Sequence, residues 1–294
     1  MNKSFTLIEI LIVIVVVGIL SSFILVGMSS LTNNANIAKS KAFSGSLRDS
    51  LLMNLVGEWK LDEGSGQTIS DSWGPNSSFL GDDGTVETDD PTWLSSGCVS
   101  QNCLSFDGVD DKVNCGNNSV FDITGSITIE GWAKFKSDAS TYRGSIIGHS
   151  AAYILNFDPT GRLYFNLRNS ADTWFCATYS PILEMNFFKN WHNYVGTWNK
   201  ENGFRYLYID GKLQNTPASC GIYDLKTTND NIIIGNVWGN WPMPGYLDEI
   251  KIYKEFASIS QIQENYYSGI NKLFSKKNIS EKEFTQRIIQ LASN

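Results

Sequence analysis

Histidine is scarce in this chain, and the short motifs of common catalytic sites are missing. Only two of the 294 residues are histidines, His149 and His192, which leaves little room for imidazole-based acid–base chemistry. There is no Gly-x-Ser-x-Gly elbow, no His-Glu-x-x-His zinc motif and no phosphate-binding loop. We interpret His192, within Trp-His-Asn, as a packed residue rather than a base. These absences predict a protein that is not an enzyme.

Charge is almost absent from residues 5–28, where Glu9 is the only ionisable side chain. This apolar or small-residue run is long enough to cross a bilayer as a helix. A carboxylate in hydrocarbon is costly and is rarely kept there without a use. A secretory signal peptide would have a shorter apolar region followed by a small-residue cleavage site. Here residues 1–4 form a short polar leader directly before the run, which predicts a cut before the helix.

The segment Ser4-Phe5-Thr6-Leu7-Ile8-Glu9 resembles the type IV prepilin signature. The resemblance implies a prepilin peptidase that cleaves between Ser4 and Phe5, and methylation of the new α-amino group. Glu9 would neutralise the buried amine of a neighbouring subunit and set the axial register of a filament. Ser4 stands where the family usually has Gly, and Val26 stands where many pilins have Pro. The implied partners are the membrane and other pilin subunits; an uncleaved single-pass anchor is the alternative.

Residues 29–55 contain no proline and continue the helical pattern. A helix from Phe5 to about Leu55 would be roughly 75 Å long at 1.5 Å per residue. The predicted order is therefore a leader (1–4), a transmembrane helix (5–28) and a helical stem (29–55). Before assembly the protein would reside in the inner (cytoplasmic) membrane, with its remaining residues outside the cytoplasm. After assembly they would lie at the cell surface or on a pilus.

From Trp59 onward the pattern changes to short alternating or aromatic runs separated by turns, with no helical pattern for almost two hundred residues. Turn sequences such as Asn202-Gly203 and Asp210-Gly211 are typical of hairpins. The expected strands lie at 127–133, 153–157, 162–167, 193–198, 205–210 and 231–235. This pattern predicts a mainly β fold, a two-sheet antiparallel sandwich or jelly roll over residues 56–256.

The predicted sandwich is acidic. Residues 56–253 contain 13 Lys and Arg against 24 Asp and Glu. Such a balance argues against nucleic acid or anionic lipid as a partner and is compatible with divalent cations and neutral glycans. A solvated acidic surface is the commoner meaning.

Five phrases resemble laminin G-like domains of the concanavalin A-like lectin and glucanase group, at 58–66, 104–113, 191–196, 207–212 and 245–253. The resemblance implies a jelly roll, a fold that hosts lectins, glucanases and spacers. Glucanases of this fold carry Glu-x-Asp-x-Glu along one strand, and no such triplet occurs here. Asp248 and Glu249 are adjacent, so on a regular strand they would point to opposite faces. A glycosidase is therefore the least favoured reading.

Asp248 has the same strand parity as Ile250 and Ile252, which should face inward. A carboxylate at the edge of a core must be answered by a cation or by several N–H donors. The resemblance implies a structural calcium ion at this position, with Asp62 and the carbonyl of Gly108 as further candidate ligands. The alternative is that Asp248 caps a turn or pairs with a lysine. Calcium needs six to eight oxygens, and the ordinary turn formers Asp107, Asp110 and Asp111 are additional candidates.

The five cysteines favour an extracytoplasmic, oxidising location. Cys98 and Cys103 flank a four-residue loop, while Cys176 and Cys220 lie in the central part of the predicted sandwich. Neither pair has metal-type spacing. We expect disulfides Cys98–Cys103 and Cys176–Cys220 with Cys115 as a buried thiol, although five cysteines permit other pairings.

Among nine tryptophans, Trp174, Trp238 and Trp241 lie in irregular stretches, where exposed rings could stack on sugars. Residues 238–244 are the best candidate for a binding loop. The alternative is that these aromatic residues only cover the edges of the sandwich.

The tail, residues 257–294, is predicted to form two helices. Ser258-Ile259-Ser260-Gln261 can cap a helix to about Phe274, and residues 280–283 form a capping box for a second helix to Leu291. Their apolar stripes could pack on the sandwich, the stem or a neighbouring subunit.

Together these features predict a pilin or pseudopilin that presents a laminin G-like, glycan-binding head for adhesion. The alternative is a membrane-anchored lectin-like protein that never polymerises.

Overall fold

The computed structural model describes residues 54–74, 76–81, 85–88, 90–136, 143–184, 186–214 and 217–292. The chain divides into two units, Met1–Asp49 and Ser50–Asn294. The predicted leader, transmembrane helix and nearly all of the predicted stem, with Ser4, Phe5 and Glu9, lie outside the described residues. Leu55, which the sequence places at the end of the stem, is the first residue of strand β1 (Leu55–Trp59). No helix within the described ranges is long and apolar enough to cross a membrane.

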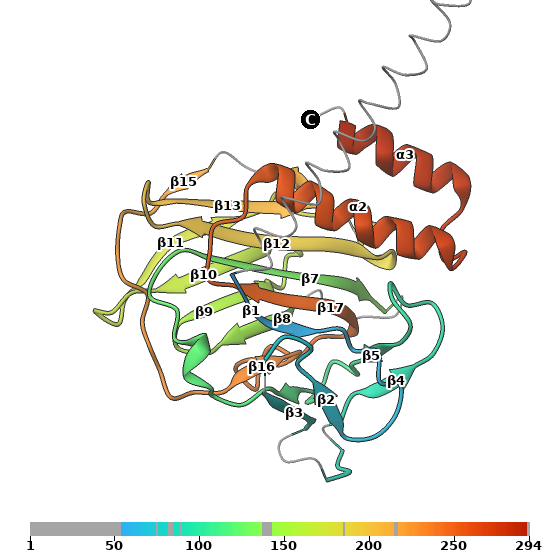
Figure 1. Cartoon of the computed structure of the whole chain (residues 1–294), viewed down its shortest axis with the longest axis horizontal. Coiled ribbons are helices and arrows are strands. Elements are labelled where there is room, and N and C mark those ends of the chain that lie inside the picture. The colour runs from blue at the N-terminus through green and yellow to red at the C-terminus, as the bar shows by residue number, and fades with distance from the viewer. Residues whose placement is uncertain are drawn as a thin grey trace, which may run out of the picture. The chain divides into compact units, whose positions relative to one another are not determined.

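The described residues form a sandwich of two antiparallel sheets (Figure 1). The first sheet follows the order β14 (Lys212–Leu213), β13 (Phe204–Ile209), β12 (His192–Asn199), β7 (Ile127–Phe135), β17 (Gly245–Tyr253), β5 (Cys103–Ser105) and β4 (Thr92–Leu94). In addition, β1 pairs with β17, and β15 (Ala218–Ser219) pairs with β13. The predicted two-sheet antiparallel architecture is confirmed.

The second sheet follows the order β11 (Trp174–Tyr179), β10 (Leu163–Arg168), β9 (Tyr153–Phe157), β8 (Gly144–His149), β16 (Ile232–Ile234), β6 (Val113–Asn114), β3 (Ser77–Leu80) and β2 (Thr68–Ser70). Two short 3-10 helices, Ser119–Phe121 and Phe187–Lys189, lie in the connections.

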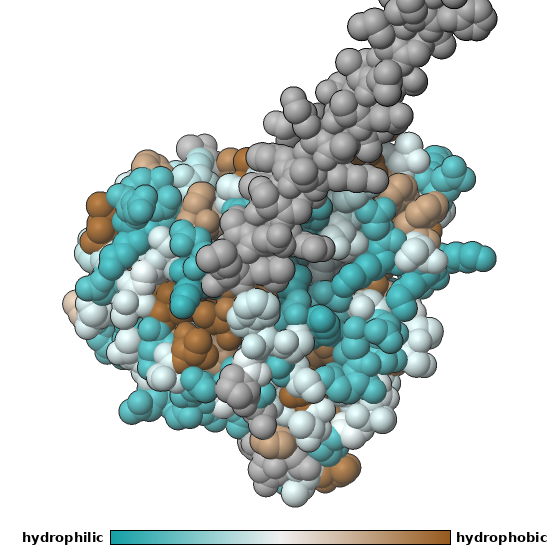
Figure 2. Space-filling view, viewed as in Figure 1, coloured by the Kyte–Doolittle hydropathy of each residue, from teal (hydrophilic) through white to brown (hydrophobic). Residues whose placement is uncertain are grey.

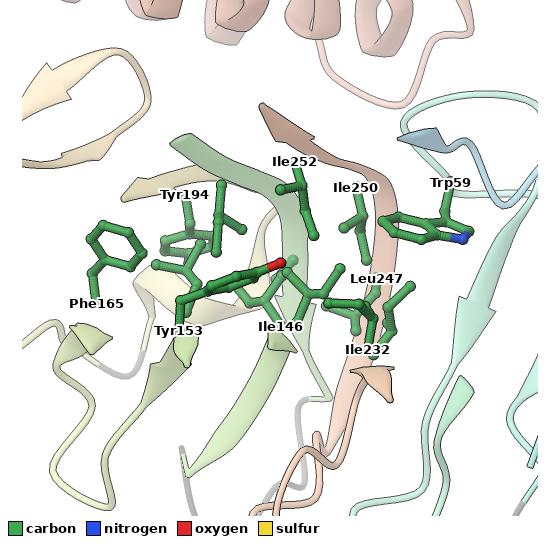
Figure 3. Packing of buried hydrophobic residues seen from close by; sticks show 14 of the residues in the cluster. Trp59, Ile146, Tyr153, Phe165, Tyr194, Ile232, Leu247, Ile250 and Ile252 are labelled. Atoms are coloured by element: carbon green, nitrogen blue, oxygen red, sulfur yellow. The ribbon is translucent and has the colours of Figure 1, made fainter. Parts of the chain in front are cut away.

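Period-two patterning explains why both sheets close on one core. In β10, Leu163, Phe165 and Leu167 are buried in the main hydrophobic cluster, while the residues between them are partly exposed. Figure 3 shows Ile250 and Ile252 of β17 pointing toward Tyr153 and other residues of the second sheet. The large aromatic side chains that the sequence distributes along the strands thus fill the space between the sheets.

The C-terminal hairpin covers the outer side of the first sheet (Figure 1). Helix α2 (Ile259–Ser275) begins with the predicted capping box of Ser258 and Gln261, and α3 spans Glu281–Ala292. Tyr266 of α2 stacks on Trp132 of β7, with ring centroids 5.7 Å apart. A Cβ at Gly269 would lie 2.2 Å from the Trp132 ring, so glycine permits this close approach. The structure therefore places the predicted tail helices and packs α2 on the sandwich, which the sequence left open.

Most of the surface seen in Figure 2 is hydrophilic or neutral, with hydrophobic residues in a few local groups. This agrees with the acidic, charged composition of the region. A group of exposed tryptophans on such a surface therefore indicates a candidate binding site.

Candidate functional site

The three tryptophans singled out by the sequence come together in one cluster. Trp174 is the first residue of β11, and Trp238 and Trp241 belong to the loop between β16 and β17. The ring of Trp238 lies 6.0 Å from that of Trp174 and 5.6 Å from that of Trp241. Both neighbours stand nearly perpendicular to it, at 87° and 74°, which is a favourable edge-to-face arrangement. We call Trp174, Trp238 and Trp241 the tryptophan cluster.

The loop that carries two of these rings is held by specific hydrogen bonds. Trp241 N–H donates to the Asn236 side-chain oxygen (3.1 Å), and Trp238 Nε1 donates to the carbonyl of Ser150 (3.2 Å). Gly239 adopts φ +68°, a left-handed conformation that glycine accepts without strain. The rings are nevertheless accessible, because Trp174 and Trp238 are 42% and 37% exposed. The loop is therefore held by a backbone and an indole N–H group, while two of the three rings remain partly exposed.

Arginine side chains flank the tryptophan cluster on both sides. The Arg168 guanidinium lies 5.3 Å from the centre of the Trp174 ring, and that of Arg143 lies 5.2 Å from the Trp241 ring. Arg143 also donates to the carbonyl of Asn240 in the same loop. These are cation–π contacts, in which the cation meets the negative face of the ring. Sequence reasoning missed these arginines, because their proximity to the rings depends on strand pairing and loop closure.

A polar hollow of about 390 Å³ adjoins the Arg168 end of the cluster. Lys226 links the hollow to Arg168. It lines the hollow and forms an ion pair with the Asp172 carboxylate, and an oxygen of that carboxylate lies 3.1 Å from Arg168 Nε. The lysine hydrogen bond, with help from Arg168, holds the pKa of Asp172 below its usual range. Further lining residues include Thr124, Ser170 and Asp224. Exposed aromatic rings beside hydroxyl, ammonium and carboxylate groups form a surface that can accept a polyhydroxylated ligand.

Asp248 lies on the outer face of the first sheet, whereas alternation along the strand predicts the face toward the core. Its partner on β7 is Trp132, which packs with Tyr266 and other buried residues of α2. Ile250 and Ile252 instead belong to the core between the two sheets. The register of β17 against β7 shifts between Asp248 and Lys251. This β-bulge reverses the parity that the sequence implied, so the expected shared face of Asp248 and Ile250 is wrong.

Glu249 is the residue at which the strand departs from regular geometry, with φ +52°. Its carboxylate accepts a hydrogen bond from Lys272 Nζ of α2 (2.6 Å), so it also faces the helix-covered side. Burial tends to raise its pKa, but Lys251 and Lys272 outweigh that effect and place it below the usual value. The expectation that Asp248 and Glu249 point to opposite faces is therefore also wrong. Both carboxylates are buried, at 0% and 5% exposure.

N–H donors answer Asp248. Its Oδ2 accepts hydrogen bonds from the backbone N–H groups of Val99 (2.8 Å) and Ser100 (2.9 Å), while Oδ1 is buried without a partner among the described residues. Burial, and next the charge of Glu249, raises the pKa of Asp248 well above its usual value. Asp62 accepts bonds from the same loop, from Gln101 N–H (2.7 Å) and Asn102 N–H (3.0 Å). The loop thus binds two carboxylates through successive backbone amides.

A disulfide closes that loop. Cys98 and Cys103 are bonded, with Cα atoms 5.5 Å apart, as the sequence predicts. Cys115 is a buried free thiol, also as predicted, and burial raises its pKa above the usual range. Cys220 is disulfide-bonded; the side chain of Cys176 is outside the described part of the chain, so their pairing stays a prediction.

The predicted calcium ligands differ in how much oxygen they leave available. Both oxygens of Asp62 accept protein hydrogen bonds, and Asp248 keeps only Oδ1. The carboxylates of Asp107, Asp110 and Asp111 have ligand atoms within 4.8 Å of one another, although Asp107 Oδ1 and Asp111 Oδ2 each accept a backbone hydrogen bond within the turn. Burial, with repulsion from its two neighbours, raises the pKa of Asp111 to about 7.

Gly108 lies in the turn that carries Asp107, Asp110 and Asp111, which form a second acidic group beside that of Asp62 and Asp248. Gly108 has φ +87°, and a Cβ there would lie 2.7 Å from the Pro244 side chain. The turn therefore needs glycine for both its conformation and its packing. Of the two acidic groups, the turn at 107–111 is the more open to solvent.

Comparison with known protein families agrees with this architecture. The family model described as the concanavalin A-like lectin/glucanases superfamily matches residues 107–263, more than half of the chain. The chain belongs to this superfamily. The superfamily match includes strands β7 to β17 and every residue of the tryptophan cluster.

A second family model, the prokaryotic N-terminal methylation motif, matches residues 1–25. The prepilin resemblance seen in the sequence is thereby confirmed. A search of curated proteins found no sequence match.

Solved structures share the superfamily fold at low sequence identity. The binding domain of Paraclostridial Mosquitocidal Protein 1 matches with a TM-score of 0.57 and 16% identity, covering 75% of this chain and 53% of that one. The binding domain of botulinum neurotoxin serotype D gives 0.54 and 14%, covering 75% and 52%. The serotype D ligand-binding domain in complex with N-acetylneuraminic acid gives 0.54 and 16%, covering 75% and 52%. This chain spans about half the length of these structures, and the similarity shows the fold alone.

Proposed function

We propose that this chain is a prepilin-type surface subunit, a pilin or pseudopilin, whose head binds glycans outside the cell and serves adhesion. The observation that carries the binding role is the tryptophan cluster, three adjoining rings of which Trp174 and Trp238 are exposed, with the 238–241 loop held by hydrogen bonds. The match to the methylation motif supports the prepilin part. Solved structures with the same fold are receptor- or ligand-binding domains of toxins, which is consistent with a binding role.

The chemistry of the cluster suits sugars better than a flat protein partner. Indole rings present an apolar face to the C–H side of a pyranose, and neighbouring polar groups hydrogen-bond its hydroxyls. The hollow next to Arg168 supplies such groups from Thr124, Ser170 and Lys226. Sugar recognition would therefore combine stacking on the rings with hydrogen bonds in the hollow.

We infer that the head acts by binding rather than by catalysis. The adjacent buried carboxylates Asp248 and Glu249 are hydrogen-bonded to a disulfide-closed loop and to α2. They are structural acceptors in that setting, not a pair facing an open cleft.

A glycan array with full-length protein in detergent micelles tests the binding role. Trp238→Ala should lower affinity for the bound glycans at least tenfold, equivalent to about 1.4 kcal/mol and within the range of about 1–3 kcal/mol for a stacked aromatic ring. Trp73→Ala is the matched control, because Trp73 is 50% exposed and lies outside the cluster. Equal loss in both variants, or no glycan bound by the wild type, would overturn the proposal.

Processing and assembly test the prepilin part. Mass spectrometry of membrane-extracted protein should find a methylated N-terminus at Phe5 in cells that have the peptidase. Glu9→Val should preserve membrane insertion but abolish sheared-filament recovery, because the neighbour's α-amine loses its buried partner. A non-polymerising anchor predicts instead that Glu9→Val is neutral or favourable in both assays. An intact Met1 would favour that alternative.

Structural calcium remains a proposal for this head. Asp107, Asp110 and Asp111 can supply clustered carboxylates, while Asp248 offers one oxygen. Chelation of full-length protein should lower the melting temperature if calcium is held, because the ion binds only the folded state. Asp110→Asn or Asp248→Asn should remove that difference according to which group holds the ion. A chelator-insensitive melt of the wild type would show that hydrogen bonds alone stabilise these carboxylates.

A further inference from the structure

The outward side chains of strand β10 form a basic and aromatic row. The outward side chains are those of Arg162, directly before the strand, and of Tyr164, Asn166 and Arg168 within it, all partly exposed. We call these four residues the β10 row. Its last member is the arginine that covers Trp174, so the row is continuous with the tryptophan cluster.

The neighbouring strand β11 adds rings that hold the arginines in place. Tyr164 lies directly opposite Tyr179 of β11, with ring centroids 4.7 Å apart, and the Arg162 guanidinium lies 5.8 Å from the Tyr179 ring. At the other end Arg168 pairs with Trp174 in the same manner. Arg162, directly before β10, and Arg168, its last residue, are six residues apart, a spacing of about 20 Å at 3.3 Å per residue of extended chain. The row thus presents two fixed cations separated by a tyrosine and an amide.

The charge of this surface is opposite to that of the head as a whole. The exposed Asp172 carboxylate is shared by two cations, Arg168 and Lys226. Asp158, close to Arg162, directs Oδ1 at the backbone N–H groups of its own turn and also interacts with the Tyr164 side chain. Within the described residues no ion pair engages the Arg162 side chain. A local surplus of positive charge therefore lies on a domain that carries more acidic than basic residues.

We propose that the β10 row and the tryptophan cluster bind an acidic glycan, a chain of sugars bearing carboxylate or sulfate groups. This inference rests on the proposed glycan-binding function and names the class of sugar. The rings would stack on pyranose faces, and the guanidinium groups would hold the acidic substituents through paired N–H donors. Asn166, already bonded to Asn156 through its amide (3.0 Å), lies between the two arginines as a fixed polar group.

A single-stranded nucleic acid is less suited to this surface. Stacking of successive bases needs ring faces presented in series along a basic groove, whereas Trp238 stands nearly perpendicular to both neighbouring rings. The acidic body would repel either polyanion, so the perpendicular arrangement of the rings is what disfavours a nucleic acid here.

The experiment compares acidic oligosaccharides with their neutral parents on full-length protein in micelles. The probes are oligogalacturonate against the same oligomer after carboxyl reduction, and dextran sulfate against dextran. We expect at least tenfold tighter binding of one acidic probe than of its neutral parent at low salt, with the preference shrinking as salt rises. The arm that shows the preference identifies carboxylate or sulfate as the recognised group.

Variants then assign that preference to the row. Arg162→Gln with Arg168→Gln should remove the acidic preference, so that the acidic probe binds no more tightly than its neutral parent. Lys276→Gln with Lys282→Gln is the matched control, removing the same charge from the exposed tail and keeping the preference. Arg168→Lys should lose part of the preference, because lysine keeps the charge but not the planar fork.

The outcomes separate this inference from the proposed function. Equal binding of acidic and neutral probes would overturn the acidic preference and leave glycan binding standing. Absence of binding to every oligosaccharide would overturn both. Tighter binding of a single-stranded oligonucleotide than of any glycan would reassign the row to nucleic acid. Full folding of each variant is checked by its melting curve.

Discussion

Two regions that the sequence marks as sites use their polar and aromatic groups in opposite ways. Around Asp248 the carboxylates are buried, and the amides of the loop closed by Cys98–Cys103 bind them. Around Trp238 the loop is held by the Trp238 indole N–H and the Trp241 backbone N–H, while the rings of Trp174 and Trp238 and the Arg168 guanidinium remain partly exposed. The first region uses its hydrogen-bonding capacity internally, and the second leaves surface for a partner. Unusual residues therefore mark stability in one region and recognition in the other.

The physical reason lies in desolvation. A buried acceptor must receive a hydrogen bond from a donor inside the protein, since an unpaired acceptor costs about 1–3 kcal/mol. An exposed ring has no such requirement, and its removal affects little except what binds to it. The contrast predicts that changes near Asp248 alter the free energy of unfolding, whereas changes in the tryptophan cluster alter affinity.

The largest expected effect is the change in the free energy of unfolding when Asp248 is replaced. Asp248→Ala removes the acceptor of two buried backbone N–H groups and should lower the free energy of unfolding by about 2–4 kcal/mol. Denaturant titration followed by tryptophan fluorescence measures it. Glu201→Ala, an exposed carboxylate in a turn, is the control and should stay within about 0.5 kcal/mol. A loss of similar size in both would remove the distinction.

The disulfide should contribute somewhat less. Replacing Cys98 and Cys103 by serine should cost about 2 kcal/mol, because the closed loop is short and the entropy of closing it is modest. Combined with Asp248→Ala, the loss should be smaller than the sum, since both changes free the same loop. Strict additivity in the double-mutant cycle would show that the loop holds its shape without the carboxylate.

Trp238→Ala should have the opposite pattern, with a small loss of stability and a large loss of glycan affinity. It removes a partly exposed ring with two edge-to-face neighbours, so we expect a stability loss of about 1 kcal/mol or less. Glycan affinity should fall at least tenfold in the same preparation. A large stability loss without an affinity change would place Trp238 with the structural region instead.

The smallest effect concerns pH, through the buried side chain of His149. Burial lowers the pKa of His149 below 6.5, although its hydrogen bond with the carbonyl of Asp230 opposes this. The unfolded chain therefore binds a proton more readily, and stability that is complete above pH 6.5 is lost as pH falls below it. His149→Gln should flatten this acid slope in melting curves recorded from pH 8 to about pH 5. An unchanged slope would assign the pH dependence to other groups.

Local sequence signals predicted the parts of the fold that local physics controls. The alternation in residues 162–167 and the turn at Asn202-Gly203 gave strands β10, β12 and β13 nearly as observed. Ser258 and Gln261 marked the start of α2 because capping satisfies N–H groups that the helix itself leaves open. The Cys98–Cys103 bridge was readable because only a short loop separates the two residues.

The candidate sites were predicted only in part. The tryptophans were chosen as residues outside regular strands, which is wrong for Trp174, the first residue of β11. The structure nevertheless brings all three together. The arginines were missed although Arg162, Tyr164, Asn166 and Arg168 alternate visibly in the sequence. Their significance depends on β11 placing Tyr179 and Trp174 beside them. Asp248 was assigned to the wrong face because parity counting assumes a regular strand.

The sequence by itself therefore determined the prepilin-type N-terminus, the sandwich class, the capped tail helices and the acidic overall charge. These follow from side-chain periodicity, turn chemistry and composition, which act over a few neighbouring residues. Only the tertiary structure decided that a bulge at Glu249 turns Asp248 toward the loop at 98–103. It also decided that Trp174 meets Trp238 and that basic residues gather on an acidic domain. Such outcomes depend on strand pairing between distant segments, where packing and the satisfaction of buried polar groups outweigh local preference.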